Sequence, residues 1–415
     1  MTKITSDLLT VNHHLYHTRW KSTFHNHIVH HLLALWALGA SPAEIQDMWD
    51  YNTPYQSSIE RDLVPGIKGL DLNDPVTFDK CLGNDDCYAV FLGFFENEVA
   101  EKGWQNIVKE YVLKGDERAD DILCRLFSDL VHPMIHLGSV IEFQQPSLIA
   151  EALAGACVHD NWPKRFLLPT EKYVRSQGIV SSMSLLHVLN SLRGDPEIAS
   201  GVKATDPFNK IPDGFLQRIT DEQLAPYLGL FQVKPTAEDL QAKMADMMQT
   251  VVYMRESIDF VLLHCATLCV FYPAILAQDW ISDLEKSRLL KATARVGAVM
   301  YAGCGSPKLD ANRIREDEGH AAKLVRAFYS LEQLPEPPVD FPIRKRDILT
   351  IAHMTMDSIE GALEADGPKV AEQIAEAVLQ RIGRGGKMVV DNMKRWVFYG
   401  GLEGAWDNRP DLKTS

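Results

Sequence analysis

The sequence predicts an all-α, multi-helix globular protein with little or no β-sheet. Apolar residues recur at helical spacing along most of the 415 residues, and few runs alternate apolar with polar residues between turns. Helix-starting signals accompany this periodicity, because Ser41-Pro42-Ala43-Glu44 combines a capping box with proline at the first helical position. No repeat of 34 or 40 residues is strong enough to indicate a solenoid. A single domain over residues 1–415 is the simplest interpretation.

The periodic stretches give the order of the expected helices. They cover residues 22–39, 42–50, 94–112, 117–131, 134–143, 147–158, 181–193, 237–275, 283–302, 317–332, 345–364 and 368–397. The stretch 237–275 is long for one helix, and we expect a break near Glu256 and Ser257. We interpret the proline-containing stretch 197–236 as a long excursion from the helical pattern, or as a lid over a site. We interpret residues 331–342 as a stiff connector.

The bulk composition excludes several classes of protein. With 46% hydrophobic and 24% charged residues, the chain can bury a sizeable core. A net charge of −14 argues against a nucleic-acid partner or an anionic membrane surface. There is neither a secretory leader pattern nor an apolar run of 18 residues, so we expect a cytoplasmic protein. The seven cysteines are irregularly spaced and form no CxxC pair, which predicts buried thiols. The oligomeric state is not indicated.

Histidines on apolar helices are the candidate functional residues. In "FHNHIVHHLLALWALGAS" (24–41), His27 lies three residues before His30 and four before His31, so the three share a helical face. "LVHPMIHLG" places His132 and His136 on one face in the same way. A single buried histidine is usually a core residue with a hydrogen-bond partner. Agreement between several helices is what favours a site.

Two further stretches extend the pattern. "DFVLLHCATLCVF" embeds His264 among thirteen residues whose one charge is Asp259. "EDEGHAAKLVRAF" places His320 and Lys323 three residues apart on one face. An inward lysine can pair with a distant acid, act as a base with a lowered pKa, or react with CO2 to form a carbamate, which is an oxygen ligand. The alternative is that Lys323 extends to solvent.

Several inward histidines with one oxygen donor suit a first-row transition metal, with iron(II) favoured for oxygen chemistry and zinc as the redox-silent alternative. HExxH and the paired Glu-x-x-His elements of di-iron bundles are absent. "GCGSP" (303–307) and "GRGGK" (383–387) follow no predicted strand, so we interpret them as helix-end or loop glycines and not as a flavin site. A zinc hydrolase and a non-catalytic binding protein stay as alternatives.

Four motifs in order carry a resemblance to a known family. They are the stretch from Phe24 quoted above, "HPMIHLGSVIEFQQPSLIAEALAGACVHD", "FVLLHCAT" and "DEGHAAKLVRAFY". Together they resemble the questin-oxidase-like family of fungal and bacterial proteins, from about residue 10 to "GGLEGAWD" near the C-terminus. The resemblance implies an oxygenase of secondary metabolism that opens the quinone-bearing ring of an anthraquinone, a small aromatic polyketide. One branch of the family implies a Baeyer–Villiger-type oxidase that uses NADPH.

Another branch resembles non-haem iron dioxygenases, with iron(II) as cofactor and O2 as co-substrate. Its ligand set, four histidines and a carboxylated lysine, maps onto this chain as His27, His132, His264, His320 and Lys323. The resemblance includes the Asn26-His27 pair, which implies His27 as the ligand in place of His30 or His31, and the same reasoning implies His132 in place of His136. The remaining clustered histidines are then expected to orient ligands or contact substrate as catalytic residues: His30, His31 and His136. Candidate pocket residues of lower specificity are Trp36, Trp49, Tyr55, Gln56, Glu142, Phe143 and Gln144.

Overall fold

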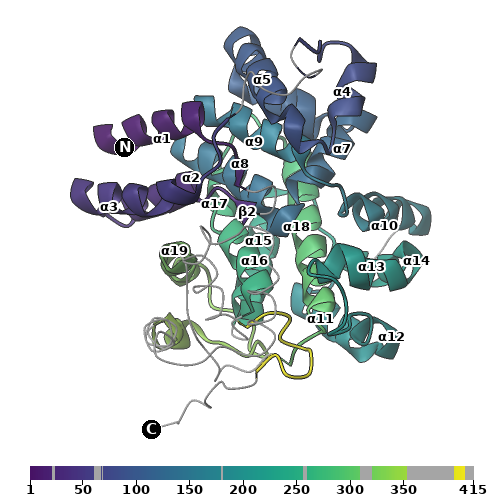
Figure 1. Ribbon diagram of the computed structural model, residues 1–415. Helices are drawn as coiled ribbons and strands as arrows, with labels where there is room; N and C mark the ends of the chain where they lie inside the picture. The colour runs from purple at the N-terminus through teal and green to yellow at the C-terminus, as the bar shows by residue number, and fades with distance from the viewer. Residues whose placement is uncertain are drawn as a thin grey trace. The chain divides into compact units, whose positions relative to one another are not determined.

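The computed structural model confirms the all-α class. It describes residues 1–20, 24–59, 67, 69–178, 181–255, 259–308, 320–352 and 397–406. Within these residues the sheet is limited to one antiparallel pair, β1 (Arg19–Trp20) with β2 (Phe24–His25) (Figure 1). The chain divides into two compact units, Met1–Arg165 with Phe271–Ser282, and Phe166–Val270 with Asp283–Ser415. The expected helix 368–397 and most of 345–364 lie outside the described residues.

The first unit contains the N-terminal helices. They are α1 (Lys3–Leu15), α2 (Ile28–Ala37), α3 (Pro42–Asn52), α4 (Pro75–Cys81), α5 (Tyr88–Lys102), α6 (Trp104–Val108), α7 (Glu117–Leu126), α8 (His132–Phe143), α9 (Pro146–Val158) and α17 (Tyr272–Leu276). Helix α5 packs along α9, and α8 packs against α9, α2 and α17. Helices α8 and α9 are buried over most of their length, so they form the core of this unit.

The second unit is built around three helices that contact one another. Its helices are α10 (Lys164–Gln177, which begins at the boundary), α11 (Leu185–Gly194), α12 (Pro196–Ala199), α13 (Leu216–Arg218), α14 (Asp221–Leu228), α15 (Ala237–Arg255), α16 (Phe260–Cys269), α18 (Asp283–Gly303) and α19 (His320–Glu332). Helices α15, α16 and α18 pack on one another, and α19 packs on α15 and α16. The stretch 197–236 carries short helices with buried Phe215, Leu224 and Phe231. Its role as a lid stays a prediction.

Local sequence signals explain where several helices begin and end. The capping box of Ser41 and Glu44 is confirmed at the start of α3. The predicted break in 237–275 is confirmed, since α15 ends at Arg255 and α16 begins at Phe260. "GCGSP" lies where α18 ends, as expected of helix-end glycine, whereas "GRGGK" lies outside the described residues. All seven cysteines are buried free thiols, which confirms the cysteine prediction.

Two predicted helix boundaries were wrong. The first helix begins at Ile28 and not at residue 22, because residues 24–25 pair with β1 and the Asn26 side chain accepts a hydrogen bond from the Ile28 amide at 3.0 Å. The predicted helix 94–112 is interrupted at Gly103, whose φ of +80° is in the left-handed region that glycine tolerates best. A helix from Tyr88 to Lys102 therefore precedes the short α6.

No helix in the described part of the chain combines the length and apolarity that a bilayer-spanning segment needs.

The close packing of α8 against the chain entering α17 gives a stability prediction. A methyl group on Gly138 of α8 would lie 2.8 Å from Cβ and Cγ of Phe271. We expect Gly138→Ala to lower the free energy of unfolding by roughly 1–3 kcal/mol, as overpacking does elsewhere. Chemical denaturation monitored by circular dichroism measures it. Gly93→Ala on α5, where a Cβ meets no atom within 4 Å, is the matched control and should not destabilise. Equal stability of the two variants would contradict the packing argument.

Candidate active site in the first unit

Imidazole rings from several elements of the first unit lie together. The ring of His25 stacks on that of His132 with centroids 4.9 Å apart, and the rings of His27 and His132 are also 4.9 Å apart. The His30 and His136 rings meet edge to face at 5.1 Å. These histidines come from β2, from the start and body of α2, and from α8. The stretch that begins at Phe24 therefore meets the "HPMIH" motif in space, 105 residues apart in sequence for His27 and His132.

His27 and His132 face each other through the nitrogens that ligate metals. Their Nε2 atoms are 2.9 Å apart. The Nδ1 atom of His132 lies 2.5 Å from the backbone oxygen of Asp129. A carbonyl oxygen only accepts, so Nδ1 carries the proton and the neutral ring presents an Nε2 lone pair toward His27. This backbone contact is the kind that fixes the tautomer of a metal-bound histidine.

The geometry of this pair fits a metal with octahedral angles. Two imidazole nitrogens, each about 2.1 Å from one ion, are about 3.0 Å apart in adjacent octahedral positions and about 3.4 Å apart in a tetrahedron. The observed 2.9 Å matches the octahedral value, and it is also the length of an N–H···N hydrogen bond in a metal-free site. Among the described residues, no three His, Cys, Asp or Glu side chains are placed to hold one ion. The first unit thus supplies two nitrogen donors of the right type.

The turn before His132 has a strained backbone. Asp129, Leu130 and Val131 have φ values of +46°, +53° and +61°, three consecutive non-glycine residues in the left-handed region. Such conformations cost on the order of 1–3 kcal/mol each and persist where the surroundings impose them. Here the turn aims the Asp129 carbonyl at the His132 ring.

The Asp129 side chain contacts another histidine, His159. Its Oδ2 lies 3.2 Å from Nε2 of His159. Burial alone would raise the pKa of the Asp129 carboxyl, but the contact with His159 and the nearby His132 ring and Arg19 guanidinium lower it below its ordinary value. Asp129 is therefore an anion beside the histidines, and its charge favours a cation held there.

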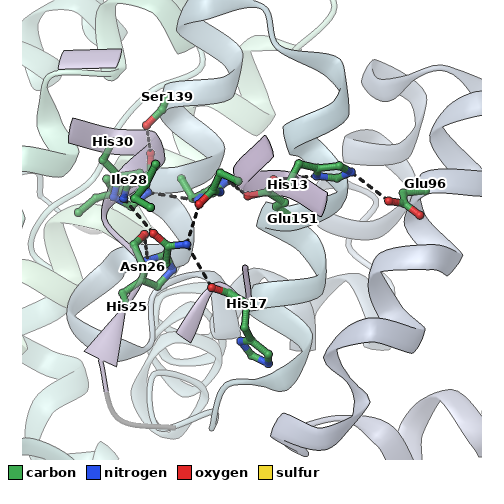
Figure 2. A network of polar contacts seen from close by, with 12 residues as sticks. His13, His17, His25, Asn26, Ile28, His30, Glu96, Ser139 and Glu151 are labelled. Carbon is green, nitrogen blue, oxygen red and sulfur yellow. Dashed lines mark hydrogen bonds and ion pairs between the residues drawn. The ribbon is translucent and has the colours of Figure 1, made fainter. Parts of the chain in front are cut away.

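The Asn26 side chain fixes the backbone next to His27. Its side-chain amide donates to Asn12 Oδ1 at 2.9 Å and to the His17 carbonyl at 3.2 Å, while its oxygen caps α2 (Figure 2). The buried amide thus fixes the chain where His27 leaves the sheet and enters the helix. His27 itself is the residue before the first turn of α2, which corrects the prediction that it lies within the helix.

The three predicted catalytic histidines are all buried in this unit. His30 Nε2 lies 3.3 Å from His136 Nδ1, which brings the two together. His31 is held separately, because Asn52 Nδ2 donates to His31 Nδ1 at 3.1 Å and Tyr55 donates to the Asn52 oxygen at 2.7 Å. The pocket candidates Trp36 and Phe143 are in edge-to-face contact at 5.6 Å, whereas Trp49 lies beside Tyr16 at 6.1 Å. Gln56 donates to the Asn52 carbonyl.

His264 of the second unit shows the same backbone contact as His132. Its Nδ1 lies 2.7 Å from the carbonyl oxygen of Phe260, one turn earlier in α16, so Nε2 is again the nitrogen with the lone pair. The helix begins at Asp259, whose buried carboxylate caps the amides of Val261 and Leu262. Burial raises the pKa of Asp259 to about 6, although backbone hydrogen bonds oppose the rise.

The C-terminal motif "GGLEGAWD" supports this helix start. The Gly400 amide donates to Asp259 Oδ2 at 2.6 Å, and the Phe260 amide donates to the Val397 carbonyl at 2.8 Å. A Cβ on Gly401 would lie 2.2 Å from the Gly305 carbonyl oxygen, so the motif needs glycine for close backbone contact.

Lys323 is inward, as one of the two sequence interpretations required. It is 3% exposed on α19, which packs against α16, so the solvent-exposed alternative is wrong. His320 is the first residue of α19, and its side chain lies outside the described part. Of the predicted ligands, the structure therefore pairs His27 with His132 in the first unit and places His264 and Lys323 on packed helices of the second.

Sequence reasoning missed residues that the structure brings to the cluster. His13 contacts Glu151 Oε1 at 2.7 Å and Glu96 Oε1 at 2.9 Å, and His136 Nε2 lies 3.4 Å from Glu151 Oε2. Figure 2 shows Glu96, His13 and Glu151 in one row. The available signal was Glu151, the single charge in the apolar run "PSLIAEALAGACV". A buried carboxylate in such a helix needs a partner from elsewhere in the fold.

This all-helical fold brings buried, oriented imidazoles next to carboxylates, and the comparisons with known proteins show that it is the fold of an enzyme of the oxidoreductase class. Residues 24–333 match the family model for questin oxidase-like proteins. The chain is 40% identical to oxidoreductase AflY of Aspergillus parasiticus, over 98% of this chain and 89% of that protein. It is 34% identical to the Baeyer–Villiger monooxygenase dmxR6 of a Cryptosporiopsis species, over 79% and 80% of the two chains. It is 31% identical to questin oxidase of Aspergillus fumigatus, over 85% and 88%. The chain belongs to the questin oxidase-like family.

Proposed function

We propose that this chain is a non-haem iron(II) oxygenase that uses O2 to open the quinone-bearing ring of a hydroxyanthraquinone. The observation that carries the proposal is the His27–His132 pair, whose Nε2 atoms lie 2.9 Å apart. The substrate class comes from the relatives, among which questin oxidases and Baeyer–Villiger oxidases recur. Both groups of relatives are named as oxidases or monooxygenases, which supports oxidative chemistry for this chain.

The proposed ligands are those that the resemblance implies: His27, His132, His264, His320 and Lys323. The first two and His264 are supported by their ring geometry and backbone contacts. Lys323 is supported by its burial, and His320 by the resemblance alone. Iron(II) bound there supplies O2 activation and a cation that favours an ionised substrate hydroxyl.

The chain's own residues account for the environment of the reaction. The Asp129 carbonyl holds His132 in one tautomer, and Asn52 does the same for His31. His30 and His136 are buried close to the proposed ligand pair, and we propose that His30 exchanges a proton with a substrate hydroxyl while His136 supports it. Burial of these rings keeps bulk water from competing for the reactive oxygen.

Metal removal tests the proposal. Protein made without affinity-tag histidines is analysed for metal content, dialysed against a chelator, and assayed for O2 uptake with questin. We expect turnover to vanish on chelation and to return with iron(II) and not with zinc, because zinc cannot change its oxidation state. Turnover that survives complete chelation would contradict the iron proposal.

A second candidate is an NADPH-dependent Baeyer–Villiger oxidase, which the names of several relatives favour. The two differ in the fate of oxygen. A dioxygenase places both atoms of ¹⁸O2 in the product, whereas the NADPH-dependent reaction places one there and reduces the other to water. Mass spectrometry of the product with and without NADPH therefore separates them.

A further inference from the structure

Five ionisable side chains of the first unit form a continuous row, each from a different helix. Glu96 of α5 contacts His13 of α1 at 2.9 Å, and His13 contacts Glu151 of α9 at 2.7 Å. Glu151 then contacts His136 of α8 at 3.4 Å, and His136 contacts His30 of α2 at 3.3 Å. The packing of these helices follows the same order, since α5 and α1 pack on α9, α9 packs on α8, and α8 packs on α2.

The row runs from the surface to the histidine cluster. The Glu96 side chain is 31% exposed, whereas His13 is 5%, Glu151 1% and His136 1% exposed. At the inner end, the His30 ring lies 6.2 Å from the His27 ring and 6.5 Å from the His132 ring, between centroids. The row therefore extends from a partly exposed carboxylate to the rings beside the proposed ligands.

The contacts of Glu151 indicate where the protons lie. A carboxylate only accepts, so His13 Nδ1, which is 2.7 Å from Glu151 Oε1, carries a proton. His136 Nε2 lies 3.4 Å from Glu151 Oε2 without forming a hydrogen bond, and we assign the proton of the His136 ring to Nε2 because this nitrogen faces the anion. The other His13 nitrogen faces Glu96, which makes this ring an imidazolium. His136, with its proton on Nε2, presents a lone pair at Nδ1, so His30 donates from Nε2.

The charges around the row support this assignment. Burial would lower the pKa of His13, but the hydrogen bonds and charges of Glu151 and Glu96 outweigh it and raise that pKa to about 9. The other ring near His13 is His14 of its own helix, at 5.1 Å. Burial lowers the pKa of His136, and the charge of Glu151 only partly opposes this, so His136 is neutral. The His25 ring lies 6.1 Å from it.

We propose that His30, His136, Glu151, His13 and Glu96 form a relay that exports the proton of a substrate hydroxyl to solvent. A proton taken up by His30 at Nδ1 releases the Nε2 proton of His30 to His136 Nδ1. His136 then releases its Nε2 proton to Glu151. His13 releases its own Nε2 proton to Glu96 and from there to water, so one proton enters and one leaves.

This inference rests on the proposed function for one point only, which is that a hydroxyaromatic substrate binds beside His30. His30 is then the catalytic residue, and the other four are positioning and relay residues. The two contacts at 3.3 and 3.4 Å are long for proton transfer, and such contacts commonly shorten when substrate binds. An ionised substrate is more electron-rich, which favours its reaction with O2.

The test compares Glu151→Gln with Glu98→Gln. Glu98 lies two residues after Glu96 on α5, is buried, and accepts a hydrogen bond from Tyr111 at 2.8 Å, so it matches the loss of a buried carboxylate without touching the relay. With questin as substrate, we expect Glu151→Gln to lower kcat roughly 10- to 100-fold, within the range of general acid–base effects, with little change in KM. Its kcat should rise with pH, because hydroxide must then remove the proton. Glu98→Gln should keep the wild-type pH profile.

Two further measurements keep the proposal open to refutation. Glu96→Gln, at the exposed end, should fold normally and shift the pH profile in the same direction by a smaller factor. Nitrogen-15 NMR of histidines in the metal-free protein should show His13 doubly protonated until the pH approaches about 9, and His136 protonated on Nε2. The metal content of every variant is measured alongside.

Different results would contradict the relay and the proposed function. If Glu151→Gln binds iron normally and its kcat–pH profile is parallel to that of the wild type, the relay is wrong and the iron site stands. If the wild type proves independent of iron, the proposed function fails, and the NMR states of His13 and His136 still decide the relay. The opposite tautomer of His136 would overturn it in either case.

Discussion

Replacing His132 with alanine is expected to abolish stable iron binding and turnover of questin while leaving the fold intact. His132 is the first residue of α8, and its ring is fixed on one side by the Asp129 carbonyl and faces His27 on the other. Loss of outer-shell partners alone typically lowers metal affinity about 10- to 100-fold, so loss of the ligand itself should exceed about 100-fold. Isothermal titration of metal-free protein with iron(II) measures the affinity.

The matched control is His187→Ala. His187 is exposed on α11 of the second unit, and its recorded contact with Ser184 involves only its backbone amide. This variant should bind iron like the wild type. His27→Ala should behave like His132→Ala, because the two nitrogens form one pair. Unchanged iron affinity in both His27 and His132 variants would remove the observation on which the proposed function rests.

The sequence predicted the fold well where the signal is local. The capping box at Ser41 and the interruption before Phe260 both follow from short patterns, and both were found. The start of α2 was missed, because the helical periodicity runs on through Phe24 and His25, which pair with Arg19 and Trp20 instead. A strand of two residues is too short to leave a periodic pattern in the sequence, and its pairing with the neighbouring strand decides its conformation.

The candidate site was likewise predicted where short sequence patterns indicate it and missed where it depends on contacts formed in the fold. Repeated imidazoles on apolar faces were enough to predict that His27, His30, His132 and His136 belong together, and the structure brings them together. His13 and Glu151 were not predicted, because no local pattern links them and the two meet only through a contact between residues 138 positions apart. The left-handed turn at 129–131 was also beyond prediction, because no residue in it is glycine or asparagine.

Lys323 carries the second prediction with a large effect. Its side chain is 3% exposed on α19, and α19 packs against the helix that holds His264. An ammonium group repels a divalent cation, whereas the carbamate formed with CO2 is an anion with oxygen donors. We expect Lys323→Ala to lose most of the bound iron and of the questin turnover. Acetate or formate at high concentration should restore part of both, since a short carboxylate can replace the missing oxygen donor.

Two other substitutions distinguish a carbamate ligand at position 323 from a lysine that is buried without binding metal. Lys323→Met fills the same space without a donor and should fail to bind iron, whereas Lys323→Glu keeps a carboxylate and should bind it weakly. Lys286→Met is the control, because Lys286 is 8% exposed on α18 of the same unit and lies 3.9 Å from Asp283. Carbon-13 NMR in labelled bicarbonate should show a carbamate signal in the wild type and in Lys286→Met, and none in Lys323→Ala. If Lys323→Ala instead retains full iron content and turnover, then Lys323 is not a ligand and its burial serves only the packing of α19.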